Sequence, residues 1–156
     1  MRVTRYKMEK NKTNPNIPLL EDIYKSVSLG ADTLTAIIGK TEDNGQKSLL
    51  SAMLDTYEGF ANQAKKRLRE LGEEARAIGT LERLPSEFSV MMSTLSDHSC
   101  AKIAQIVIEE AVINVSAFKE KIRTADEAGA DINNIRLAGD ILAFHEEMIN
   151  KMRRYL

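Results

Sequence analysis

The stretch "ILAFHEEMIN" at residues 141–150 decides the fold, because it places a histidine on the apolar face of a helical pattern. Apolar residues continue this pattern at steps of three and four from about Ile132 to Leu156, which is the spacing of an amphipathic helix. His145 falls in the middle of that face. The pattern therefore predicts a last helix in which His145 is either a ligand in a buried site or a core residue with a hydrogen-bond partner.

Three further amphipathic segments precede this helix. We expect them to form helices at about residues 17–38, 46–71 and 86–124. Gly30 lies on the apolar stripe of the first helix, where glycine lowers helix stability, so we expect a neighbour to approach closely there. The two halves of the third helix have apolar stripes that do not coincide on a helical wheel. We therefore expect a kink at residues 96–100 or a change of neighbours along that helix.

The composition favours few, long elements. The chain of 156 residues has only three prolines and eight glycines, which leaves little turn chemistry. It is 43% apolar and 29% charged, enough for one core, and at 5% aromatic residues that core must be aliphatic. The predicted fold class is all-α, a four-helix bundle in which two helical hairpins are joined by a longer connection.

The connection at residues 72–85 leaves the topology open. Fully extended, a segment of this length reaches about 48 Å. A helix of about 25 residues is about 38 Å long. The connection can therefore cross the whole length of a helix, but only if it is nearly straight. A crossover bundle and an up-down-up-down bundle both agree with the sequence.

The start of the chain is basic. Residues 1–16 carry a charge of +4, whereas the whole chain carries −1. We expect a flexible basic tail at residues 1–16 and a bundle domain at residues 17–156. A tail of this kind can bind nucleic acid, and deletion of residues 1–13 would test that hypothesis. We do not expect nucleic acid as a partner, because no face of a single charge sign accompanies the tail.

The sequence also predicts a cytoplasmic protein. No apolar run approaches the ~20 residues that a membrane helix needs, so we expect no membrane partner. The basic start is followed by polar residues, and we expect no signal peptide. The single cysteine, Cys100, cannot form an internal disulfide, which suits a reducing compartment.

The two hairpins, the longer connection and a last helix ending "FHEEMINKMRRYL" (residues 144–156) resemble the ferritin-like superfamily. The chain also resembles small bacterial bundle proteins of unknown function. The phrases that carry this narrower resemblance are "LLEDIYKSVSLGADTL" (19–34), "SLLSAMLDTYEGF" (48–60) and "HSCAKIAQIVIEE" (98–110). The resemblance covers about residues 17–156 and implies the bundle fold without an activity.

The resemblance can be tested at the metal-binding positions. Active ferritin-like proteins use a glutamate from each of two helices and a Glu-x-x-His from each of the other two. This chain has no Glu-x-x-His, and the residue three before His145 is Leu142. We therefore predict no catalytic residue, no cofactor and no metal site. If a single-ion or ligand site exists, we expect it at His145, Glu110 and Tyr57. Otherwise we expect His145 to hydrogen-bond to Tyr57 or Glu110 in the core.

The segment "IAQIVIEEAVINV" at residues 103–115 is apolar around most of its circumference. A helix in a bundle of four needs only one buried face, so the surplus predicts burial against a fifth element or a second subunit. Our first hypothesis is a non-enzymatic bundle, most simply a homo-oligomer through this helix, that acts by self-association or partner binding. The alternative is a degenerate ferritin-like protein that binds one metal ion or small ligand near His145.

Overall fold

The computed structural model describes residues 14–75 and 85–156, and every regular element in these ranges is helical. The elements are α2 (Asn16–Ile38), α3 (Asn44–Glu70), α4 (Ser86–Thr94), α5 (Cys100–Glu127), α6 (Ile132–Met152) and a 3-10 turn, η1 (Arg153–Tyr155). The predicted all-α class is confirmed, although the described residues form five α-helices instead of four. None of these helices is long and apolar enough to cross a membrane. Most of the predicted basic tail, residues 1–13, lies outside the described ranges.

The helix predicted at residues 86–124 is divided into α4 and α5. Residues 95–99 leave the helical conformation, and their side chains bind the backbone that a continuous helix would use. Asp97 accepts a hydrogen bond from the Ser99 amide at 3.0 Å, and the Ser99 hydroxyl accepts one from the Lys102 amide at 3.2 Å, which caps α5. The mismatch between the two apolar stripes therefore reflects a break between two helices.

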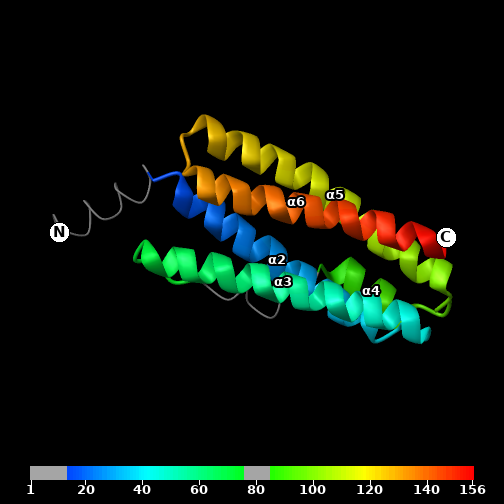
Figure 1. Cartoon of the computed structure of the whole chain (residues 1–156). Helices are drawn as coiled ribbons and strands as arrows, with labels where there is room; N and C mark the ends of the chain where they lie inside the picture. The colour runs from blue at the N-terminus through cyan, green and yellow to red at the C-terminus, as the bar shows by residue number, and fades with distance from the viewer. Residues whose placement is uncertain (1–13, 76–84) are drawn as a thin grey trace.

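The two long hairpins follow a crossover order. The starts of α3 and α5 lie together, because the Gln46 Nε2 donates to the carbonyl oxygen of Cys100 at 2.9 Å. The starts of α2 and α6 also lie together, because the Asn16 Oδ1 accepts from the Asp131 amide at 2.7 Å. Figure 1 shows α3 ending at the left of the view and α5 beginning at the right. The chain between them therefore returns along the length of the molecule, which excludes the up-down-up-down alternative.

Two of the long helices are followed by a glycine with positive φ. Gly72 follows α3 with a φ of 79°, and Gly129 follows α5 with a φ of 84°, a conformation that favours glycine. In α3 the amide of Glu73 donates to the carbonyl of Leu68 at 2.9 Å, and in α5 the amide of Ala130 donates to that of Ala125 at 3.0 Å. These bonds satisfy carbonyls that the helix ends leave without a partner.

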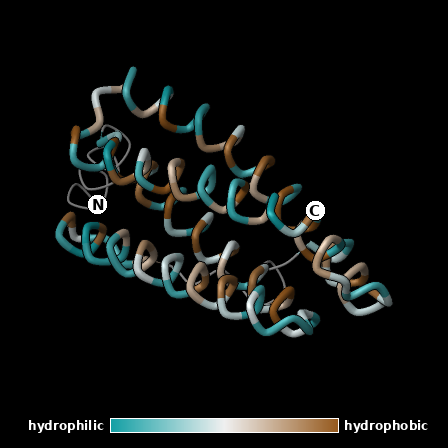
Figure 2. The backbone as a smooth tube through the Cα atoms, turned by 45° about the vertical axis from the view of Figure 1, so that its right-hand side comes forward, coloured by the Kyte–Doolittle hydropathy of each residue, from teal (hydrophilic) through white to brown (hydrophobic). Residues whose placement is uncertain are grey.

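The core is aliphatic along most of its length, as the composition predicted. Figure 2 shows hydrophobic positions recurring along each long helix among hydrophilic ones, the pattern of helices that bury one face. The short helix α4 also contributes, because Phe88 and Met92 are buried in the same core. The crossover connection is therefore packed on the molecule at α4.

The closest approach between helices is at Gly30. A Cβ atom at this position would lie 2.7 Å from both Cε1 and Cζ of Tyr57 in α3. Tyr57 is only 2% exposed, and its ring also contacts Phe144 and His145 of α6, so it cannot move aside freely. The prediction that Gly30 marks a close approach is confirmed.

Replacement of Gly30 by alanine should lower the free energy of unfolding by about 1 kcal/mol. Overpacking costs about 1–3 kcal/mol, which exceeds the gain of up to about 1 kcal/mol in helix propensity. The matched control is Gly59→Ala in α3, where the added Cβ meets no atom within 4 Å. The control should raise the free energy of unfolding by about 0.5–1 kcal/mol. Urea denaturation measures both, and equal stabilisation by the two substitutions would contradict the contact.

Candidate functional site

His145 lies in an aromatic cluster where α6 meets α3 and α5. Its ring centroid is 5.7 Å from that of Tyr57, 5.8 Å from that of Phe118 and 6.0 Å from that of Phe144. Phe60 joins the cluster through Phe144, at 5.8 Å between centroids. His145 is 1% exposed, so the predicted burial of this residue is confirmed.

The predicted hydrogen bond of His145 to Tyr57 or Glu110 is wrong. Within residues 14–75 and 85–156, neither ring nitrogen of His145 has a hydrogen-bond partner. The reason is that Tyr57 contacts the imidazole through its aromatic ring, which is tilted by 51° relative to the imidazole plane. Loss of water by burial lowers the pKa of His145 to about 4. The imidazole is therefore neutral at neutral pH.

Tyr57 links the two other residues of the predicted site. It contacts His145 through its ring, and its hydroxyl interacts electrostatically with the carboxylate of Glu110 on α5. Burial raises the pKa of the Tyr57 hydroxyl, and the negative charge of Glu110 raises it further. Burial also raises the pKa of the half-buried Glu110, with a smaller contribution from Glu109. All of these shifts favour the uncharged form of the group, as expected for a packed core.

The residues around His145 do not fit the metal centre of active ferritin-like proteins. Leu142 stands where that motif has a glutamate. In the described part of the chain, no three or more His, Cys, Asp or Glu side chains are grouped so that they could hold a metal ion. The chemistry that the cluster offers is aromatic packing around a neutral imidazole.

The His145→Leu variant should lose less stability in acid than the wild-type protein does. Above about pH 6.5, the ordinary pKa of histidine, the ring is neutral in both states. Below it, the unfolded chain binds a proton that the folded chain does not bind until about pH 4. The contribution of the neutral ring to the free energy of unfolding is therefore fully present above pH 6.5. It decreases as the pH falls, and at pH 5 it is lower by about 2 kcal/mol.

This effect is measured as the difference in pH slope between the two proteins, from urea denaturation at pH 7, 6 and 5. Any constant difference in stability at pH 7 cancels in that comparison. Carboxylates titrate in both proteins and cancel as well. Parallel slopes for the wild-type protein and His145→Leu would contradict the burial of an unpaired imidazole.

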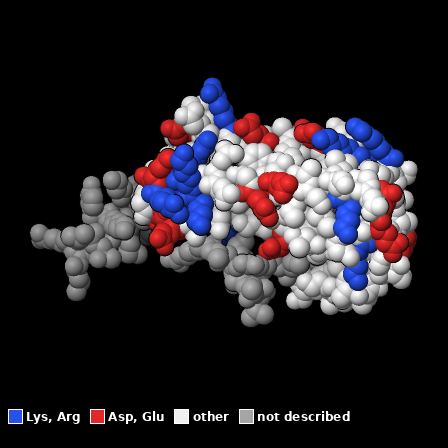
Figure 3. Space-filling model, turned by 60° about the horizontal axis from the view of Figure 1, so that its bottom comes forward, with Lys and Arg blue, Asp and Glu red and all other residues white. Residues whose placement is uncertain are grey.

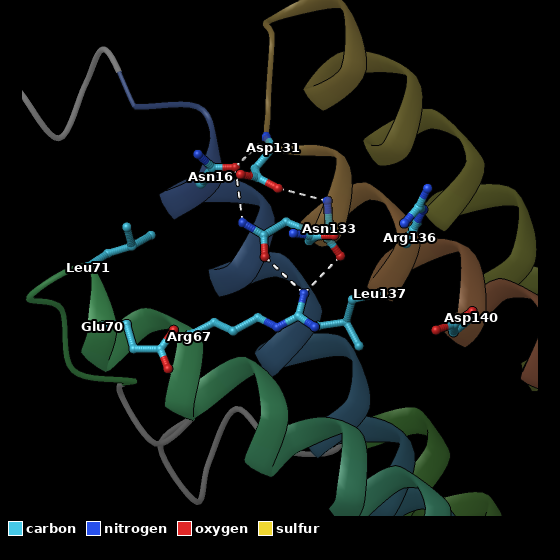
Figure 4. A pocket seen from close by; sticks show the side chains of 10 residues that line it. Asn16, Arg67, Glu70, Leu71, Asp131, Asn133, Arg136, Leu137 and Asp140 are labelled. Carbon is cyan, nitrogen blue, oxygen red and sulfur yellow. Dashed lines mark hydrogen bonds between the residues drawn. The ribbon is translucent and has the colours of Figure 1, made fainter.

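A second concave site lies at the end of the molecule where α2 starts, α3 ends and α6 starts, and we call it the end pocket (Figure 4). Its volume is about 560 Å³. Its lining contains two arginines and three carboxylates, which are Arg67, Arg136, Glu70, Asp131 and Asp140. The end pocket therefore combines both charge signs and does not select an anion or a cation by charge alone.

Arg67 spans the end pocket. Figure 4 shows its side chain reaching from α3 to the start of α6, where Nη1 donates to the Asn133 carbonyl at 2.8 Å and to the Asn134 Oδ1 at 3.0 Å. The Asn134 Nδ2 in turn donates to the Asn16 Oδ1 at 3.1 Å. Three helix ends are thus joined by one polar network. The sequence gives no sign of it, because Arg67 and its partners are 66 and 67 residues apart.

Gln46 is a second residue that sequence reasoning missed. It is fully buried at the opposite end of the molecule, where its Nε2 holds the first carbonyl of α5. His98 lies in the link between α4 and α5. Its Nδ1 is 3.1 Å from the Glu42 carboxylate, and its Nε2 is 2.7 Å from the Leu95 carbonyl. These contacts indicate that His98 stabilises the conformation of the link.

The charged surface shows no single-signed face on the side seen in Figure 3. Lys and Arg side chains gather near one end of the molecule, but Asp and Glu side chains lie directly beside them. In the sequence, the basic run at residues 65–69 is likewise followed by Glu70, Glu73 and Glu74. On this side of the molecule the two charge signs are therefore interspersed.

The middle of α5 exposes two large apolar side chains. Val112 is 49% exposed and Ile113 is 63% exposed, and they are adjacent. The other exposed large apolar residues of the described chain lie on α4 or at helix and chain ends; they are Leu71, Val90, Met91, Ile132 and Leu156. Among the four long helices, α5 is thus the one whose central turns present such a surface.

Comparison with known proteins gives no match to a family model, a curated protein or a solved structure. The described residues form three candidate functional regions: the aromatic cluster around His145, the end pocket and the exposed face of α5.

Proposed function

We propose that this protein is a non-enzymatic helical bundle that acts by associating with a second copy of itself through α5. The observation that carries the proposal is the exposure of Val112 and Ile113 in the middle of that helix. Burial of apolar surface contributes roughly 25 cal/mol per Å², so a partner that covers this pair gains stability. Symmetric pairing of identical subunits is the commonest way to cover such a patch.

We further infer that the four long helices form a ferritin-like four-helix bundle. The crossover order supports this inference, because ferritin-like bundles have one long crossover connection between two hairpins. The short helix α4 would then be an insertion in that crossover.

The chemistry of the other two sites supports a non-enzymatic role. Burial favours the uncharged forms of His145, Tyr57 and Glu110. In the end pocket, Arg67 binds the start of α6 and so serves the fold. Binding of one metal ion or small ligand near His145 is the alternative, and it draws support only from the two unpartnered ring nitrogens. Thermal stability measured with added Fe, Zn or Mn tests that alternative.

Replacement of Ile113 by lysine should abolish self-association without unfolding the protein. The charge would be buried against the partner in the dimer but solvated in the monomer. The matched control is Val90→Lys on the separate helix α4, where the replaced side chain is 61% exposed. Sedimentation velocity across the micromolar range should show the wild-type and control proteins approaching twice the 17.5 kDa monomer mass. A wild-type protein that stays at the monomer mass contradicts the proposed function.

A further inference from the structure

Six exposed residues of α5 form one line, which we call the outer stripe: Gln105, Glu109, Val112, Ser116, Lys119 and Arg123. They follow one another at steps of four and three, so they share a face of the helix. All six point away from the interior of the molecule, since each is exposed while Ala111 and Phe118 on other faces are buried. The outer stripe has the spacing by which one helix packs along another.

The charges of the outer stripe are ordered along its length. Its first half carries Glu109, its centre carries Val112 and Ser116, and its second half carries Lys119 and Arg123. When the stripe is laid against a reversed copy of itself, residues symmetric about position 114 face each other. Glu109 then faces the partner's Lys119, and Val112 faces the partner's Ser116. The stripe is complementary in charge to its own antiparallel copy.

We propose that two copies of this chain pair through their outer stripes, antiparallel, with a twofold axis at position 114. This inference rests on the proposed function and specifies its partner and geometry. Because the axis makes the interface self-complementary, the Glu109–Lys119 pair occurs twice in the dimer. Ile113 follows Val112 in the sequence and lies to one side of the outer stripe. In the dimer it lies next to the partner's Ile113, and the two side chains form the apolar centre of the interface.

The side chains of the stripe are available for this pairing to different degrees. No hydrogen bond or ion pair involves the Lys119 side chain within the described chain. Glu109 accepts one hydrogen bond, from the Gln105 Nε2 at 3.1 Å, and keeps further acceptor capacity. Arg123 is already held by Glu120 and by Glu127, the latter at 2.7 Å. The Glu109–Lys119 pair therefore sets the register.

The size of the contact predicts its strength. One helix from each copy buries less than the roughly 1,200–2,000 Å² of a stable complex, which places the interface among weak, reversible ones. Charge pairs at such an interface act mainly on orientation and partner choice. Charge reversal is therefore a sharper probe of the register than loss of apolar area.

The first test measures dimer dissociation by sedimentation equilibrium of the full chain. Glu109→Lys and Lys119→Glu should each raise the dissociation constant about tenfold, because each replaces two attractive pairs by two repulsive ones. The double variant restores both pairs in reversed sense and should return to within about threefold of wild type. Glu146→Lys, an exposed reversal on α6, is the control and should leave the constant unchanged.

The outcomes separate the register from association itself. A wild-type dimer that neither single reversal weakens, or that the double variant fails to restore, overturns the register and leaves self-association standing. A monomeric wild-type protein overturns both proposals. Circular dichroism of each variant confirms that the helices are retained.

The second test reads orientation by disulfide cross-linking in a Cys100→Ser background, since Cys100 is partly exposed. Val112→Cys and Ser116→Cys are made as separate proteins and oxidised alone or mixed. Antiparallel stripes bring position 112 opposite the partner's position 116, so the mixture should cross-link severalfold faster than either protein alone. Faster cross-linking of each protein with itself overturns the antiparallel arrangement.

Discussion

The contact between Tyr57 and Gly30 is the constraint on which the arrangement of the two hairpins depends. The missing side chain at position 30 lets the Tyr57 ring lie against α2, closer than any Cβ would allow. The same ring meets Phe144 edge-on at 5.0 Å between centroids and contacts His145. One side chain therefore packs within its own hairpin and against the other, which fixes their separation at the middle of the molecule.

Polar contacts at the two ends complete what the aromatic contact begins. Arg67 joins α3 to the start of α6, and Gln46 joins α3 to the start of α5. Hydrogen bonds are directional, so these residues fix which helix ends meet, whereas packing in the middle fixes how far apart the helices lie. The crossover order follows from both. The outer face of α5 takes no part in these contacts and is exposed.

The sequence predicted the features that depend on local chemistry or periodicity. Gly30 was identified by its place on an apolar stripe, and the burial of His145 by the spacing of its neighbours. Neither ring nitrogen of His145 has a hydrogen-bond partner among the described residues. The sequence could not predict this, because it depends on where the side chains of three helices point. Arg67 and Gln46 were missed because their partners are distant in sequence. The apolar surplus of residues 103–115 was visible, but only the structure assigns its exposed part to the central turns of α5.

Tyr57 couples the two hairpins, and a double-mutant cycle between Tyr57→Leu and Phe144→Leu measures that coupling. The two residues lie on α3 and α6, so their coupling energy reports contact between hairpins. From urea denaturation of the wild-type protein, both single variants and the double variant, we expect a coupling of about 0.5–1.5 kcal/mol. Losses of stability that simply add, within about 0.3 kcal/mol, would contradict the account.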